Sequence, residues 1–396
     1  MSLKTGAKPG SGQDLSRLPS LTGMRIIAAL LVFFFHALYQ FPFADQGTAG
    51  VYNSIFGQGG WTGVGFFFVL SGFVLAWSAR AGDTTPKFLR RRFFKIFPNH
   101  LVTYLAAVVV FLLAGTALGG WKAVANLVLL QAWFPQIDVE TSVNPVSWSL
   151  SVEALFYLSF PFLLRLVNRI RPDRLWYWAG AVVAVIFTVP VLAWALPEQP
   201  GLFFAPVSEW EFWLVYVLPP VRVLDFTLGI LLAKIVQQGR WINLPLLPSM
   251  ALVVAAYALS SQVSWTYGLV AVMVVPLGLM IAAAANADLT GRWSPLRSRA
   301  MVWLGNVSFA FYLWHSLVLT QVHRALGLTS NWSDPGAFGY LALSFAVTLL
   351  LAWGLFALVE EPVMRRWSKS RRRPPAVPEA GPEQPVPVGA GQGGRR

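Results

Sequence analysis

Apolar runs of about twenty residues recur along almost the whole chain, and this pattern limits the fold more than any other feature. A helix of that length spans the roughly 30 Å hydrocarbon core of a bilayer. Of the 396 residues, 56% are hydrophobic and only 12% are charged. The sequence therefore predicts an all-α integral membrane protein rather than a soluble domain.

Ten segments have the length and composition of transmembrane helices. They are expected at about 24–42, 61–80, 99–118, 147–166, 176–196, 214–236, 245–261, 264–285, 301–322 and 338–361. The polar, basic N-terminus (1–20) and the Pro- and Gly-rich basic tail (368–396) are predicted to be disordered. The membrane domain is therefore placed at 21–367.

The distribution of charge predicts the orientation in the membrane. If the short segment 121–133 does not cross, one set of connecting segments, which includes 42–60, contains only Lys122 and Arg324 as basic residues. Nearly all other Lys and Arg fall on the opposite side, which the positive-inside rule assigns to the cytoplasm together with both termini. The formal net charge of +13 is thus explained by topology, and no nucleic-acid partner is expected. The Ala, Arg, Gly and Pro bias favours a bacterial gene and hence the bacterial inner membrane.

The first predicted span carries two ionisable residues, Arg25 and His36. They are eleven positions apart, so they point to the same helix face and lie about 16 Å apart along its axis. Ionisable groups inside a membrane are costly, and they usually face a cavity where they have a function. The pair therefore predicts a long substrate whose polar head binds Arg25 and whose reactive end lies at His36.

Two further titratable residues are expected at a similar depth to His36. Glu153 is near the start of the fourth span, and His315 is in the corresponding half of the ninth. A carboxylate beside a buried imidazole is a common arrangement for a general base, so Glu153 is predicted to orient His36 or to balance its charge. The alternative for His315 is a hydrogen bond that only joins two helices.

A cluster of basic residues is predicted at the cytoplasmic end. Arg91, Arg92 and Lys95, in a basic loop before the third span, join Arg25 there. Such a cluster suits a phosphorylated ligand that arrives from the cytosol. The chain has no cysteine, so a thiolate nucleophile is excluded, and no metal site is expected.

Several motifs occur in order along the chain. They are Arg25 and His36 separated by ten residues, GVGFFFVLSGFVL at 63–75, FLRRRFFKIFP at 88–98, WSLSVEALFYL at 148–158, RVLDFTLG at 222–229, LGNVSFAFYLWH at 304–315 and VEEP at 359–362. Together they resemble the acyltransferase 3 family of integral-membrane O-acyltransferases. The chain differs from the family pattern at Gly65, Lys95 and Asp225, where an acid, Arg and Glu are common.

The resemblance implies an activity and a set of site residues. A small acyl group, often acetyl, would pass from acyl-CoA as co-substrate to a hydroxyl of a sugar, a glycosylated natural product or an envelope polymer. His36 would be the essential imidazole, and Arg25 would help to hold the donor. The matching motifs add further candidates: Trp148, Ser151, Arg222, Asp225, Tyr312 and His315. No permanently bound cofactor is implied.

Several alternatives stay open at this point. His36 could act as general base or carry a transient acyl group. Arg222 and Asp225 are at i, i+3 and could simply neutralise each other. The acceptor is expected to be a sugar or natural-product hydroxyl first, and an envelope polysaccharide second. From another functional class, a transporter or lipid flippase would use the same charged residues for ion coupling.

Overall fold

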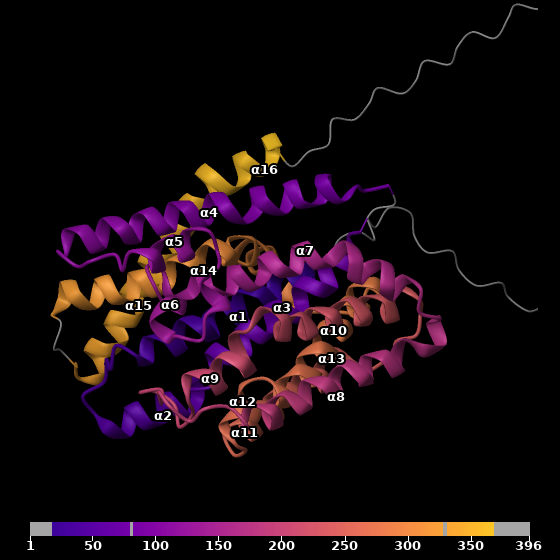
Figure 1. Ribbon diagram of the computed structural model, residues 1–396, viewed down its shortest axis with the longest axis horizontal. Helices are drawn as coiled ribbons and strands as arrows, with labels where there is room; N and C mark the ends of the chain where they lie inside the picture. The colour runs from indigo at the N-terminus through magenta and orange to yellow at the C-terminus, as the bar shows by residue number, and fades with distance from the viewer. Residues whose placement is uncertain (1–17, 80–81, 328–330, 368–396) are drawn as a thin grey trace, which may run out of the picture.

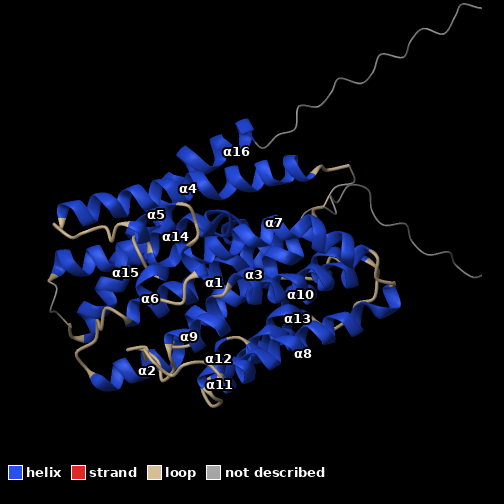
Figure 2. Cartoon of the chain, viewed as in Figure 1, coloured by secondary structure: helices blue, strands red, loops and turns tan. Residues whose placement is uncertain are grey.

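The computed structural model describes residues 18–79, 82–327 and 331–367, which form a bundle of helices without any β-strand (Figure 1, Figure 2). The longer helices are α1 (Pro19–Leu38), α3 (Gly59–Trp77), α4 (Thr85–Leu113), α7 (Trp148–Asn168), α8 (Leu175–Ala193), α10 (Pro219–Gln237), α11 (Leu246–Ser260), α13 (Ala271–Leu289), α14 (Arg299–Leu326) and α15 (Asp334–Leu355). The shorter ones are α2 (Gln46–Phe56), α5 (Trp121–Leu127), α6 (Ile137–Glu140), α9 (Glu209–Phe212), α12 (Trp265–Leu269) and α16 (Glu361–Trp367). The predicted disordered ends fall outside the described residues, except that α1 already begins at Pro19.

Nine segments of the described chain are long and apolar enough to cross a membrane, which confirms a multi-pass helical membrane protein. The helix at the predicted seventh span, α11, has only 15 residues, or about 22 Å at 1.5 Å per residue. Nine of the ten predicted spans thus have long counterparts, and the seventh, at 245–261, corresponds to α11, a shorter apolar helix beside α13. The cytoplasmic location of both termini stays a prediction.

Two segments that the sequence assigned to loops are helical. The basic stretch before the third predicted span forms the first half of α4, which continues through Pro98. The connecting segment 42–60 contains α2, where the Asp45 side chain accepts a hydrogen bond of 2.6 Å from the Thr48 backbone N–H. A carboxylate at this position satisfies a backbone donor that the helix leaves unpaired.

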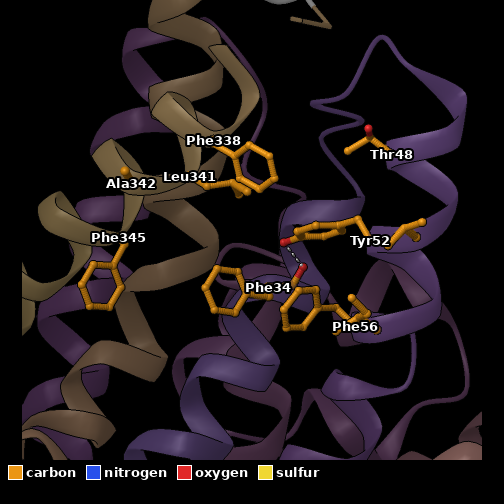
Figure 3. Close-up of a pocket in the computed structure, with 10 residues that line it drawn as sticks. Phe34, Thr48, Tyr52, Phe56, Phe338, Leu341, Ala342 and Phe345 are labelled. Atoms are coloured by element: carbon orange, nitrogen blue, oxygen red, sulfur yellow. Dashed lines mark hydrogen bonds between the residues drawn. The ribbon is translucent and has the colours of Figure 1, made fainter. Parts of the chain in front are cut away.

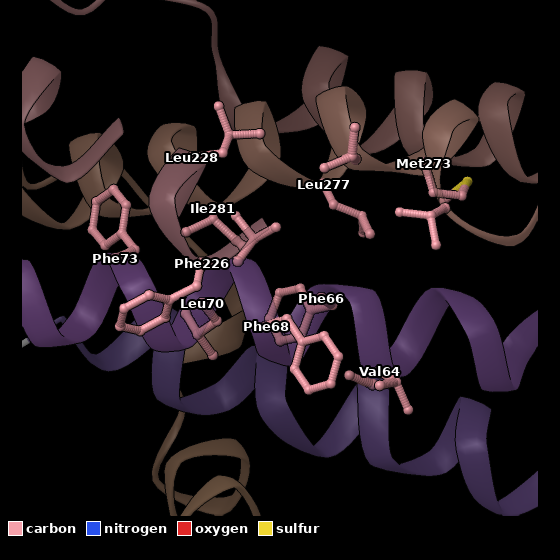
Figure 4. Packing of buried hydrophobic residues seen from close by; sticks show 14 of the residues in the cluster. Val64, Phe66, Phe68, Leu70, Phe73, Phe226, Leu228, Met273, Leu277 and Ile281 are labelled. Carbon is pink, nitrogen blue, oxygen red and sulfur yellow. The ribbon is translucent and has the colours of Figure 1, made fainter. Parts of the chain in front are cut away.

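Helix α1 packs between α3 and α14, and α3 in turn packs closely against α10. The α3–α10 contact depends on two glycines. A Cβ on Gly72 would lie 1.9 Å from the Phe226 carbonyl oxygen, and one on Gly229 would lie 2.0 Å from that of Val69. Small residues let helix backbones approach this closely inside a membrane. Apolar side chains of α3, α10 and α13 fill the space around the contact (Figure 4).

The two ends of the bundle differ in charge. At the basic end α1 and α14 begin and α7 and α10 end. At the acidic end, on the left in Figure 1, lie the end of α1 and the short helices α2, α6 and α9. The connections assigned to the acidic end contain seven acidic residues and two basic ones. The acidic residues are Asp45, Asp138, Glu140, Glu198, Glu209, Glu211 and Asp334.

A cavity of about 480 Å³ lies between α2 and α15 at the acidic end (Figure 3). Its lining is apolar apart from the hydroxyls of Thr48 and Tyr52, and the Tyr52 hydroxyl donates to the Phe34 carbonyl at 3.0 Å. No charged side chain lines this cavity. It therefore lacks the groups needed for acid–base chemistry, and the candidate site lies elsewhere.

Candidate active site

Arg25 lines three neighbouring cavities in the half of the bundle nearer the basic end. Their volumes are about 50, 120 and 470 Å³. The largest is formed by the first turns of α1 together with Trp77 of α3 and Asn306 of α14. Within the described residues, the Arg25 side chain has no recorded hydrogen bond or ion pair. A half-buried guanidinium that faces a cavity without a partner is suited to bind an anion.

The smallest cavity runs from Arg25 towards the pair of imidazoles. Glu153, Ser149 and Tyr312 provide its polar lining, and the rest is mainly aromatic. The Tyr312 ring lies 5.5 Å from the ring of His315, which is one turn later on α14. The cavities thus lead from the cation on α1 to the tyrosine next to the histidines.

Glu153 does not contact His36. Its carboxylate accepts a hydrogen bond of 3.0 Å from the Tyr157 hydroxyl, one turn later on α7. Glu153 lines the same two smaller cavities as Arg25. The prediction that Glu153 orients His36 is therefore wrong, and the carboxylate belongs to the Arg25 side of the site.

The predicted basic cluster is only partly assembled around Arg25. Arg92 and Lys95 line the middle cavity. Lys95 also forms an ion pair with Glu360, which lies on the π-helical turn Phe356–Glu360 at the end of α15. Arg91 instead binds Asp83, with 3.0 Å between Nη1 and Oδ1, and it does not line the cavity.

His36 contacts His315 of α14. Nδ1 of His36 lies 3.2 Å from Nε2 of His315 and 2.9 Å from the Val32 carbonyl oxygen. The centroids of the two rings are 4.9 Å apart, and the ring planes are inclined at 64° to each other. His315 is fully buried, whereas His36 is half-buried.

The partners of the two rings define which nitrogens carry hydrogen. Nδ1 of His315 lies 2.5 Å from the Tyr312 carbonyl oxygen, which can only accept, so this nitrogen donates. In the neutral ring, Nε2 of His315 is then an acceptor. Nδ1 of His36 therefore faces two acceptors and must carry a hydrogen itself. Its own Nε2 is left with a free lone pair, as a general base requires.

The other motif residues surround this site at different distances. The Tyr312 hydroxyl is 2.9 Å from the Ser149 hydroxyl, and both line the smallest cavity. Trp148 is buried with its ring 5.0 Å from that of Tyr216. The buried Ser151 hydroxyl has no hydrogen-bond partner in the described chain and does not line the cavities around Arg25.

Arg222 and Asp225 form a buried ion pair within α10. The guanidinium and carboxylate are 2.9 Å apart, and both side chains are 1% exposed. Neither lines the cavities around Arg25, so the structure supports the expectation that the pair neutralises itself. Within the part of the chain that is described, no group of three or more His, Asp or Glu side chains could hold a metal ion.

A model of the acyltransferase domain family, acyltransferase 3, matches residues 18–357, which include nearly all described helices. The chain belongs to the acyltransferase 3 family. The match confirms the resemblance that the motifs indicated, and it identifies the protein as an acyltransferase. The membrane helices agree with this. No solved structure matches the chain.

Three relatives show the range of this acyltransferase family. The chain is 43% identical to Acyltransferase MdmB of Streptomyces mycarofaciens, over 91% of this chain and 95% of the relative. It is 23% identical to Peptidoglycan O-acetyltransferase OatA of Listeria monocytogenes, over 88% of this chain but only 56% of that protein. It is 24% identical to Exopolysaccharide production protein ExoZ of Rhizobium meliloti, over 79% of this chain and 92% of the relative.

Sequence reasoning did not select four residues that the structure places at the site. Phe67 and Phe309 line both smaller cavities, and Ser149 binds Tyr312. Glu360 holds Lys95 and accepts a hydrogen bond of 3.1 Å from the Asn99 amide. Ser149 lies in the motif WSLSVEALFYL and Glu360 in VEEP, so membership of these motifs could have marked both as site residues. The two phenylalanines carry no such signal because apolar residues are everywhere in the chain.

Proposed function

We propose that the protein transfers a small acyl group, acetyl in the simplest case, from acyl-CoA to a hydroxyl of a sugar or glycosylated natural product. The observation that carries this proposal is the pair of histidines with a free Nε2 on His36. The smallest cavity leads from Arg25 to Tyr312, whose ring lies beside that of His315. Arg25, with Arg92 and Lys95 in the middle cavity, would bind the phosphates of the donor. The bacterial inner membrane is the proposed location.

In the proposed reaction, His36 acts as general base. Its Nε2 takes the proton from the acceptor hydroxyl as the hydroxyl oxygen attacks the thioester carbonyl. The C–S bond breaks as the C–O bond forms, and the imidazolium returns the proton to the departing CoA thiolate. The products are an ester and free CoA. Nε2 of His315 accepts from Nδ1–H of His36, which stabilises the positive charge on the ring during the step.

A transient acyl-histidine is the alternative route for the same site. Nε2 of His36 would then attack the thioester itself, and the acceptor hydroxyl would displace the acyl group in a second step. Both routes need the same tautomer of His36. Trapping of labelled protein after mixing with acyl-CoA alone distinguishes them.

An envelope polysaccharide is the second candidate acceptor. The names of two relatives, a peptidoglycan O-acetyltransferase and an exopolysaccharide production protein, favour it. Acyltransferase MdmB, to which the chain is 43% identical, carries neither term in its name and so gives this acceptor no support. A transporter or flippase is the least supported alternative, because the chain belongs to an acyltransferase family.

The test compares small molecules and glycans from cells with and without the gene by mass spectrometry, followed by transfer in vitro. With acetyl-CoA as donor, an acetylated product and stoichiometric free CoA are expected. His36→Ala should reduce turnover by about 10²- to 10⁴-fold, while the thermal stability of the detergent-solubilised protein is retained. His323→Ala, further along α14, is the matched control and should remain active. Undiminished transfer by His36→Ala would refute the proposal.

A further inference from the structure

Glu140 is a buried carboxylate at the acidic end that the proposed chemistry does not use. It ends α6, a single turn in the segment that folds back between α4 and α7. Its side chain is 3% exposed, and within the described residues it has no recorded hydrogen bond or ion pair. A buried carboxylate without a partner is costly, and such groups in native proteins usually have a ligand, water or ion that satisfies them.

Aromatic hydroxyls from three different helical elements lie within electrostatic range of this carboxylate. They belong to Tyr39 after α1, Tyr216 before α10 and Tyr312 of α14. The Tyr216 ring packs 4.9 Å from that of Trp61. Carboxylates and aromatic rings are the groups with which proteins bind organic cations.

A second carboxylate increases the preference for a cation. Burial and, to a smaller extent, the charge of Glu209 at the start of α9 together raise the pKa of Glu140 from 4.5 to about 8. A cation between the two would offset the effect of Glu209.

The other charged groups on this segment, Lys122 and Asp138, bind each other. The seven acidic and two basic residues assigned to this end would also attract a cation. The positive-inside rule explains the scarcity of Lys and Arg here, but not the abundance of acids.

The tyrosines around Glu140 adjoin the imidazole pair. The Tyr39 ring lies 6.0 Å from the ring of His36, and the Tyr312 ring lies 5.5 Å from that of His315. Tyr312 also lines the smallest cavity, so this one side chain lies between the cavities around Arg25 and the surroundings of Glu140. A molecule held by Glu140 and these tyrosines would therefore lie next to the histidines, on the side away from Arg25.

We propose that Glu140 and Glu209, with the surrounding tyrosines, form the acceptor subsite and bind a protonated amine of the acceptor. The acceptor is accordingly an amino sugar or a product that carries one, held with a hydroxyl next to Nε2 of His36. This inference rests on the proposed function, because the acceptor is defined as the molecule that His36 deprotonates.

The test measures binding of small probes to the full chain in lipid nanodiscs, without acyl donor. The probes are the methyl 2-, 3- and 6-amino-deoxyglucosides and their uncharged N-acetyl counterparts. At least one amine should bind about tenfold more tightly than its N-acetyl counterpart, equivalent to about 1.4 kcal/mol. Glu140→Gln should abolish this preference. Glu198→Gln, an exposed acid assigned to the same end, is the matched control and should retain it.

Calorimetry in buffers of different ionisation enthalpy gives a second readout. Because Glu140 is mostly protonated at pH 7 and must ionise when the cation binds, the wild type should release a proton on binding. Glu140→Gln should release none. Equal binding of amine and N-acetyl probes, including no binding of either, overturns the inference. So does a preference that survives in Glu140→Gln.

The transfer assay separates this inference from the proposed function. Amine binding that depends on Glu140, in a protein that transfers no acyl group, would retain the subsite and refute the acyltransferase mechanism. Acyl transfer only to acceptors without an amine would retain the mechanism and refute the subsite.

Discussion

Replacing His315 tests whether it stabilises the charge on His36. In His315→Leu, Nδ1–H of His36 keeps the Val32 carbonyl as acceptor but loses Nε2 of His315 at 3.2 Å. A hydrogen bond to a charged group contributes about 1.5–3 kcal/mol. Since this bond strengthens as His36 becomes charged, its loss should reduce kcat by roughly 10- to 150-fold. The KM for acyl-CoA should not change, because Arg25 is untouched.

His315→Gln is the matched variant, since its amide oxygen can accept the same hydrogen bond. It should recover a large part of kcat, which a purely steric role of His315 would not predict. The assay follows release of free CoA from acetyl-CoA in nanodiscs, with the acceptor identified by mass spectrometry. Thermal stability of each variant is measured in parallel. Wild-type kcat in His315→Leu, or equal damage in both variants at unchanged stability, would refute the reasoning about the histidine pair.

Three further outcomes are expected. Arg25→Gln should raise the KM for acyl-CoA by roughly 10- to 150-fold, since a charge-assisted contact to phosphate is lost; an unchanged KM would place the donor elsewhere. Gly72→Ala should destabilise the bundle by about 1–3 kcal/mol or more, because its Cβ would lie 1.9 Å from a carbonyl oxygen. Gly65→Ala, with its nearest atom 3.8 Å away, should be nearly neutral, and thermal unfolding in detergent compares the two. For Glu140, a pKa raised from 4.5 to about 8 means that the folded state binds more protons between these values, so stability falls as pH rises. Glu140→Gln should therefore melt higher than wild type at pH 9 and similarly at pH 5; equal melting at pH 9 would contradict the burial argument.

Membrane insertion explains why so much of the architecture could be predicted. Each span must be apolar over its own length, so nine of the ten predicted spans have full-length counterparts. The remaining one, the seventh predicted span, corresponds to the shorter helix α11, because apolar composition does not fix where a helix begins. The basic segment that contains Arg91 and Lys95 was assigned to a loop on its charge, yet it forms the first half of α4, because long basic side chains reach polar surroundings from a helix.

The candidate site was predicted in part. Helical periodicity placed Arg25 on the face of α1 that carries His36, and the cavities around Arg25 agree with a site there. Depth along the helices placed both Glu153 and His315 level with His36, and Glu153 was predicted to be its partner. The structure chose His315, because depth says nothing about how one helix is rotated against another.

The sequence by itself determined the class of fold, the order of its motifs and the shared face of Arg25 and His36, because these depend on composition and on the geometry of a single helix. Only the tertiary structure decided that His36 pairs with His315, that Lys95 is held by Glu360, and that Glu140 is buried beside tyrosines from three other elements. Such contacts join residues as far as 279 positions apart. These contacts depend on how pairs of helices pack against each other, for example at Gly72. The sequence pattern of a single helix does not specify that packing.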